Sequence, residues 1–227
     1  MPVISIVNPK GGTGKTTTAL LLACELSLKK NVSLIDVDPR HPITKWHGLK
    51  KDTTAKKKLC IVSNDSENTI MQQIEEHASK SPFVIVDLEG VASKRAAFSI
   101  SQSDFVIIPM QEQQQDADAT LNVIKEIINI EKMSRKKIPF SIVFTRTKVV
   151  AKSRTARFIA SQFIKAEKID CFDTEINERD AFSAIFTTGD TVRTLDQKQN
   201  NGVPKAIRNI EQFTTEAVQK LLKLQSA

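Results

Sequence analysis

The chain has 227 residues, of which 40% are hydrophobic, and a formal net charge of +7. This size and content suffice for one large core, so a single domain over residues 1–227 is expected. No stretch has the 18 apolar residues of a membrane span, and residues 1–8 lack the pattern of a secretory signal. The widely separated Cys24, Cys60 and Cys171 lack metal-ligand spacing. A cytoplasmic protein with reduced cysteines is therefore expected.

Predicted strands and helices alternate along the chain. Apolar runs predict strands at Val3–Val7, Val32–Val37, Leu59–Val62, Phe83–Leu88, Phe105–Pro109 and Phe140–Thr145, and a weaker one at Ile169–Phe172. Helical spacing predicts helices at Thr16–Leu28, Thr69–Ser79, Lys94–Ser101, Ala117–Ile130 and Ser153–Lys165. The strand runs are continuously hydrophobic, which is typical of strands covered on both faces. The sequence predicts an α/β fold with a doubly wound, mostly parallel sheet and helices on both faces.

The segment NPKGGTGKTTTAL, residues 8–20, joins the first predicted strand to the first predicted helix. It nearly fits the phosphate-loop pattern G-x-x-x-x-G-K-[ST], but Pro9 stands at the first glycine position and an additional Lys10 follows. Glycine-rich backbone can approach phosphate oxygens, while Lys15 would reach the outer phosphates and Thr16 would bind Mg²⁺. The alternative, an ordinary glycine-rich turn, does not explain the adjoining GK and TT. The predicted nucleotide-binding residues are Gly11, Gly12, Thr13, Gly14, Lys15, Thr16 and Thr17.

Three acidic residues follow predicted strands, at the edge of the sheet where ligands bind in such folds. Asp36 and Asp38 end the second strand, and because alternate residues point to the same face, their carboxylates share a side. Near a triphosphate they are suited to hold Mg²⁺ through water and to orient an attacking water. Asp87 ends another strand and is a candidate Walker-B carboxylate, so the predicted metal ligands are Thr16, Asp36 and Asp87. A turn at Asp38-Pro39 and a strand-end cap at Asp87 are the simpler alternatives.

The pattern K-G-G-x-G-K-T-T with its early Lys10, followed by D-x-D-P, resembles the deviant Walker-A ATPases of the ParA/MinD group over essentially the whole chain. The resemblance implies an ATP- and Mg²⁺-dependent homodimer in which Lys10 crosses to the partner subunit's nucleotide. It also implies that Asp38 positions the hydrolytic water and that Asp87 is the Walker-B residue. The implied catalytic residues are Lys10, Lys15 and Asp38.

Other segments resemble the short members of this group. Pro39–Trp46 is similar to ParF-like plasmid-partition proteins and to VirC-type ATPases that assist T-DNA transfer, and NERDAF at Asn177–Phe182 especially resembles the VirC type. Pro109 and Asp116 also match the ParF-like spacing. The resemblance implies segregation or positioning of DNA, with DNA transfer as the alternative. Sequence-specific DNA recognition would then fall to a centromere-binding or relaxosome-type partner protein.

The chain departs from relatives at two positions near the expected site. Arg40 stands where glutamine is frequent. Glu89 follows Asp87 in a segment that reads D-x-P-P in many relatives. Glu89 is expected near the phosphates, where a change in the hydrolysis rate and a change in the coupling to a partner protein are the two alternatives for its effect.

Basic residues are concentrated between Lys132 and Lys168, where Glu167 is the one acidic residue. Such runs are most often solvated surface, but this excess favours a polyanionic partner. The resemblance implies nonspecific binding of duplex DNA, which needs only phosphate contacts. The scarcity of aromatic residues argues against single-strand recognition. The DNA-binding candidates are Arg146, Lys148, Lys152, Arg154, Arg157 and Arg193.

The last predicted helix, Pro204–Leu224, combines an apolar stripe with basic residues. We expect it to pack on the sheet, with a MinD-like membrane-binding helix as the alternative. A metabolic P-loop enzyme and an ATP-dependent polymer are further alternatives for the chain as a whole.

Overall fold

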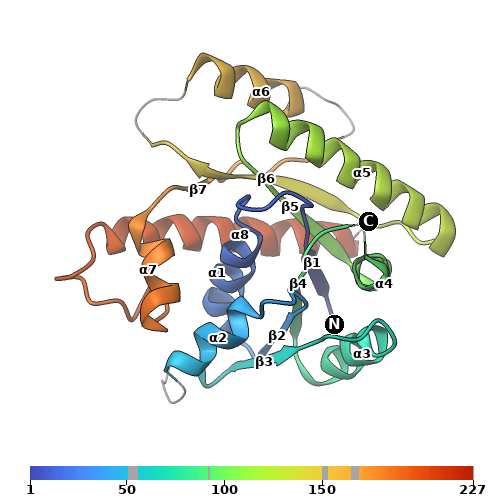
Figure 1. The fold of residues 1–227 in the computed structure, drawn as a ribbon, viewed down its shortest axis with the longest axis horizontal. Helices are drawn as coiled ribbons and strands as arrows, with labels where there is room; N and C mark the ends of the chain where they lie inside the picture. The colour runs from blue at the N-terminus through green and yellow to red at the C-terminus, as the bar shows by residue number, and fades with distance from the viewer. Residues whose placement is uncertain (51–55, 92, 150–152, 165–168, 227) are drawn as a thin grey trace.

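The computed structural model describes residues 1–50, 56–91, 93–149, 153–164 and 169–226. Within them, seven strands form one sheet in the order β3-β2-β4-β1-β5-β6-β7, and every neighbouring pair is parallel (Figure 1). The strand β1 lies inside the sheet, with β4, β2 and β3 on one side and β5, β6 and β7 on the other, which confirms the predicted doubly wound α/β sheet. The strands are β1 (Val3–Ile6), β2 (Val32–Asp36), β3 (Leu59–Ser63), β4 (Phe83–Asp87), β5 (Phe105–Met110), β6 (Phe140–Thr147) and β7 (Ile176–Asn177).

Helices cover both faces of this sheet (Figure 1). Those in the described part of the chain are α1 (Lys15–Ser27), α2 (Pro42–Leu49), α3 (Ile70–Lys80), α4 (Lys94–Gln102), α5 (Gln114–Ser134), α6 (Arg154–Ile164), α7 (Asp180–Thr188) and α8 (Val203–Ser226). Buried residues of α1, α2, α7 and α8 form one hydrophobic core, and those of α3 to α6 form the other. Successive strand residues such as Val3 and Ile4 belong to opposite cores. Both faces of each inner strand therefore lie against a hydrophobic core, which explains the predominantly hydrophobic runs.

The structure differs from the sequence prediction at the seventh strand. The run Ile169–Phe172 is not a strand, since it makes a single bridge between Cys171 and Ile142, and β7 lies further along the chain. The apolar character of this run comes from core packing, because Phe172 lies against Phe213 of α8 with ring centroids 5.2 Å apart. The strand prediction there was wrong, because hydrophobic packing and strand pairing give the same pattern in so short a run.

The last helix, α8, packs on the sheet as expected: it contacts α1 and β7 and shares a core with strand residues such as Phe105. Phe213 and Leu221 are buried in the core that α8 shares with α1, whereas Leu222 and Leu224 near its end are exposed. In the described part of the chain, no helix combines the length and hydrophobicity needed to cross a membrane.

Candidate functional site

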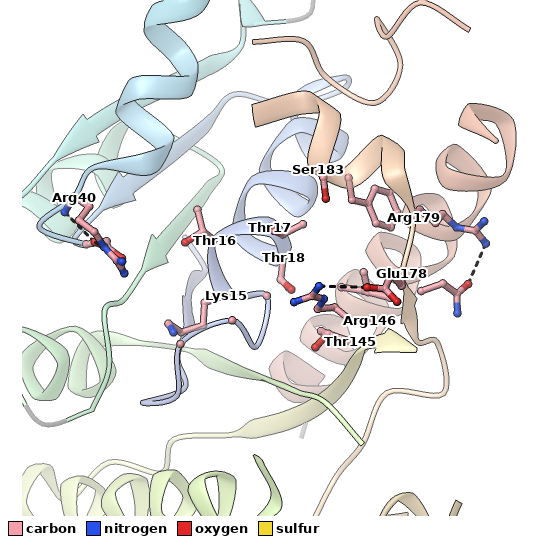
Figure 2. Close-up of a pocket in the computed structure, with 17 residues that line it drawn as sticks. Lys15, Thr16, Thr17, Thr18, Arg40, Thr145, Arg146, Glu178, Arg179 and Ser183 are labelled. Carbon is pink, nitrogen blue, oxygen red and sulfur yellow. Dashed lines mark hydrogen bonds and ion pairs between the residues drawn. The ribbon is translucent and has the colours of Figure 1, made fainter. Parts of the chain in front are cut away.

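A pocket of about 340 Å³ opens at the carboxyl ends of the strands, where doubly wound sheets bind ligands. The phosphate loop, residues 9–17, and the start of α1 line one end of it (Figure 2). The end of β6, β7 and the start of α7 line the other end. We call these the phosphate end and the far end. The predicted nucleotide-binding residues Gly11, Gly12, Gly14, Lys15, Thr16 and Thr17 all line the pocket, and Thr13 is buried behind them.

The phosphate loop is held in shape by the protein itself. Gly12 and Gly14 have φ values of 82° and 88°, a left-handed conformation that favours glycine. Thr145 Oγ1 donates a hydrogen bond to the Thr13 carbonyl oxygen at 2.7 Å, and Gln111 Nε2 donates one to the Gly12 carbonyl oxygen at 2.8 Å. Because these bonds come from β6 and from the segment after β5, the loop is fixed to the sheet.

Lys15 lies at the phosphate end. Its ammonium donates a hydrogen bond to the Lys10 carbonyl oxygen at 3.1 Å. Burial lowers the pKa of Lys15, while the carboxylates of Asp87 and Asp38 raise it and so oppose part of this shift. A partly desolvated cation beside a glycine-rich loop is suited to bind a phosphate group.

The two acids predicted to bind metal lie side by side. Asp36 and Asp87 end the adjacent strands β2 and β4 in direct register. One oxygen of Asp36, Oδ2, accepts hydrogen bonds from the Ile43 and Thr44 backbone N–H groups at 3.1 and 2.9 Å and from the Thr44 hydroxyl at 3.1 Å. Asp36 therefore caps the N-terminus of α2. Its other oxygen has no partner, and neither oxygen of Asp87 has one.

These three buried oxygens fit a hard cation. Burial raises the pKa of Asp87 to about 7; Thr16 and Lys15 lower it, whereas Asp36 and Asp38 raise it. The Thr16 hydroxyl lies close enough to Asp87 to lower its pKa, although no hydrogen bond joins the two side chains. The described residues contain no group of three or more His, Cys, Asp or Glu side chains that could hold a metal alone. Mg²⁺ in nucleotide sites needs only one or two carboxylates, because phosphates and waters supply the rest.

Asp38 lies at the pocket beside Arg40. Its Oδ1 accepts hydrogen bonds from the Arg40 backbone N–H at 2.9 Å and from Nε at 3.3 Å. Burial alone would raise the pKa of Asp38, but the bonds from Arg40 outweigh it and lower the pKa. Arg40 therefore binds the Asp38 carboxylate, which is expected to position the attacking water. The second departure from relatives, Glu89, lies 3.9 Å from the Arg95 guanidinium.

Lys10 pairs within its own chain. Its ammonium donates to Asp116 Oδ1, and the other Asp116 oxygen accepts from the Gln111 backbone N–H at 3.1 Å. Asp116 is fully buried in the first turn of α5, whereas the Lys10 side chain is 31% exposed. The sequence pattern singled out both residues without connecting them, because 106 positions separate them. The crossing of Lys10 to a partner's nucleotide stays a prediction.

The far end contains residues that the sequence analysis did not assign to the site. Asn177, Glu178, Arg179 and Phe182 line it, opposite Thr145 and Arg146. The NERDAF segment therefore lies in the pocket, although its resemblance to VirC-type chains was the one signal that singled it out. The Arg146 guanidinium lies 3.2 Å from the Glu178 carboxylate (Figure 2).

The DNA-binding candidates that the structure describes differ in their surroundings. Arg146 lines the pocket, and Arg193 is bound by Glu25 and Glu211 at 2.6 Å each. Lys148, Arg154 and Arg157 are exposed around the end of β6 and on α6. Lys152 lies outside the described residues. DNA binding by any of them stays a prediction.

Comparisons with known proteins agree with this geometry. The sequence profile of the family described as VirC1 protein matches residues 1–226. The protein ParA of Rhizobium radiobacter is 33% identical over 97% of this chain and 98% of its own length. The protein virC1 of the same organism is 25% identical over 98% and 95% of the two lengths. The solved structure of apo McdA from Cyanothece superposes with a TM-score of 0.80 at 19% identity, covering 96% of this chain and 99% of that chain. The chain belongs to the VirC1 family, within the ParA/MinD group of P-loop ATPases.

Proposed function

We propose that the protein is a Mg²⁺-dependent ATPase that switches between an ATP-bound homodimer on DNA and a released form. The observation that carries this proposal is the phosphate end of the pocket. There, Lys15 and the fixed loop lie beside the partnerless oxygens of Asp36 and Asp87.

Each side chain has a distinct role in the proposed hydrolysis. Lys15 and the loop N–H groups bind the outer phosphates, and Thr16, Asp36 and Asp87 hold Mg²⁺. When bound, Mg²⁺ neutralises the charge that develops on the phosphate oxygens. Asp38, released from Arg40, orients the attacking water. Because catalysis of phosphoryl transfer is mostly positioning and charge stabilisation, these groups suffice without a covalent intermediate.

Lys10 supplies the dimer dependence in this proposal. Its partly exposed ammonium leaves Asp116 and binds the nucleotide of the partner subunit. Asp116 therefore competes with that nucleotide for Lys10 and holds the lysine while the chain is alone. The buried Asp116 carboxylate makes this resting position specific, since an unpaired buried charge is costly.

In the ATP-bound form, the basic residues of β6 and α6 bind duplex DNA without sequence preference, placing the protein on the nucleoid. The expected process is segregation or positioning of DNA with a centromere-binding partner. Membership of the VirC1 family favours a second candidate, assistance to T-DNA-like transfer with a relaxosome-type partner. Stimulation of ATP turnover by one partner class and not the other would distinguish the two candidates.

ATP turnover and nucleotide affinity test the switch directly. We expect Lys15→Ala to lose nucleotide affinity by about 10- to 150-fold, because a charge-assisted contact contributes about 1.5–3 kcal/mol. Lys10→Ala should bind nucleotide like the wild type but lose dimer-dependent turnover. Asp38→Ala should bind ATP and not hydrolyse it. Lys94→Ala on the exposed start of α4 is the control for loss of a lysine charge.

Two outcomes contradict the proposal. Equal loss of affinity in Lys10→Ala and Lys15→Ala would make Lys10 another phosphate ligand of its own subunit. DNA binding that is indifferent to both nucleotide and salt would remove the switch, because phosphate contacts weaken steeply with salt.

A further inference from the structure

Arg146 has an unusual backbone conformation at the far end of the pocket. Its φ is 52°, in the left-handed region that costs a non-glycine residue about 1–2 kcal/mol. The β6–β7 register shifts between Thr145 and Thr147, so Arg146 occupies a β-bulge. Bulges of this kind redirect a side chain, often beside a functional site.

Both neighbours of Arg146 keep the bulge in place. Thr145 is tied to the phosphate loop through Thr13 at 2.7 Å. The Thr147 carbonyl oxygen accepts from the Glu178 backbone N–H at 3.0 Å, and its hydroxyl accepts from Asn177 Nδ2 at 2.9 Å. The strain is therefore balanced by contacts on either side, and the Arg146 side chain is directed at Glu178.

The Arg146–Glu178 ion pair joins the two walls of the far end (Figure 2). Its side chains are 54% and 55% exposed, and pairs this exposed contribute about 0.2–1 kcal/mol. Such a pair opens easily. Arg146 also lines a neighbouring hollow of about 360 Å³ with Gln111 and Lys148, so this residue borders two open spaces.

We propose that Arg146 and Glu178 form a gate over the base-and-ribose end of a bound nucleotide, and that this gate sets how long the nucleotide stays. The inference rests on the proposed function, since it requires that a nucleotide occupies the pocket. A bound nucleotide with its phosphates at the loop directs its ribose and base toward the far end. The Glu178 carboxylate accepts hydrogen bonds from ribose hydroxyls, and the planar guanidinium of Arg146 packs on the base. Opening the pair admits or releases the nucleotide.

The test measures release of Mg·ADP from the full chain by chasing radiolabelled ADP with unlabelled ADP. Arg146→Gly removes the guanidinium and keeps the bulge, because glycine adopts this φ without strain. Glu178→Gln keeps the shape and removes the charge. We expect each variant to release ADP about threefold faster, which corresponds to about 0.65 kcal/mol. The double variant should release it no faster than the faster single variant, because both changes break one interaction.

Matched controls separate the gate from its alternatives. Glu76→Gln breaks a similarly exposed ion pair, with Lys80 on α3, and should release ADP like the wild type. Inorganic tripolyphosphate lacks base and ribose, so its affinity should be equal in wild type and gate variants. Unchanged release in both single variants, or accelerations that multiply in the double variant, would overturn the gate. Failure of the proposed function looks different, since wild type would then bind ADP no better than Lys15→Ala.

Discussion

At the phosphate end of the pocket, a buried hydrogen bond from Thr145 and a second one from Gln111 fix a loop whose glycines are unstrained. At the far end, by contrast, an exposed ion pair depends on a strained arginine. Rigid elements position charged groups precisely, and weakly held elements can open without disturbing the core. Under the proposed function, this difference lets different residues of one pocket set the affinity for the nucleotide and the rate at which the nucleotide is released. Changes at the phosphate end should therefore have large effects, and changes at the far end small ones.

The largest effect is expected from Asp87→Asn, measured by urea unfolding between pH 5 and pH 8 without Mg²⁺ or nucleotide. Burial raises the pKa of Asp87 from 3.8 to about 7. Between these values the folded protein keeps a proton that the unfolded chain releases, so the free energy of unfolding falls as pH rises and then levels off above about pH 7. Asparagine does not ionise, so the free energy of unfolding of Asp87→Asn does not fall in this way as pH rises. The variant should gain stability over wild type up to pH 7, on the order of 4 kcal/mol at most.

The same variant should lose function as it gains stability. Mg·ADP affinity should fall, because the ionised Asp87 that destabilises the empty pocket is the form that binds the cation. Asp118→Asn, which removes an exposed carboxylate from α5, controls for the loss of one negative charge. Stability curves of Asp87→Asn and wild type that run parallel across this pH range would show that Asp87 carries no such penalty.

A smaller effect is expected from Thr145→Val, which tests the fixing of the phosphate loop. Valine keeps the shape of this buried side chain and removes the hydrogen bond to Thr13. The variant should lose about 1–2 kcal/mol in free energy of unfolding and bind ADP more weakly, because a buried carbonyl group loses a donor. Thr214→Val is the matched control, since the buried Thr214 hydroxyl has no partner and its loss should not destabilise. Equal losses in both variants would point to packing instead.

The same contrast explains what the sequence could predict. The phosphate end was predicted because its chemistry is local: glycines, lysine and threonine occupy one short loop, and Asp36 and Asp87 end continuous apolar strands. The helix α2 was missed because its N-terminus is capped by Asp36 on another element. The Arg146–Glu178 pair was missed because 32 positions separate its members, which only the short β7 brings together.

The smallest predicted effect is the response of ADP release to salt, and it distinguishes the two ends most sharply. Salt screens exposed charges strongly and buried ones much less. Raising NaCl from about 0.05 M to about 0.5 M should speed ADP release from wild type by about twofold through the gate, in addition to any change at the phosphate end. Glu178→Gln has no ion pair at the gate for salt to screen, so its ADP release should respond less to salt by that factor, while Glu76→Gln should respond like wild type. Identical salt responses in wild type and Glu178→Gln would mean that the Arg146–Glu178 pair does not hold the nucleotide, and that release is governed by the phosphate end alone.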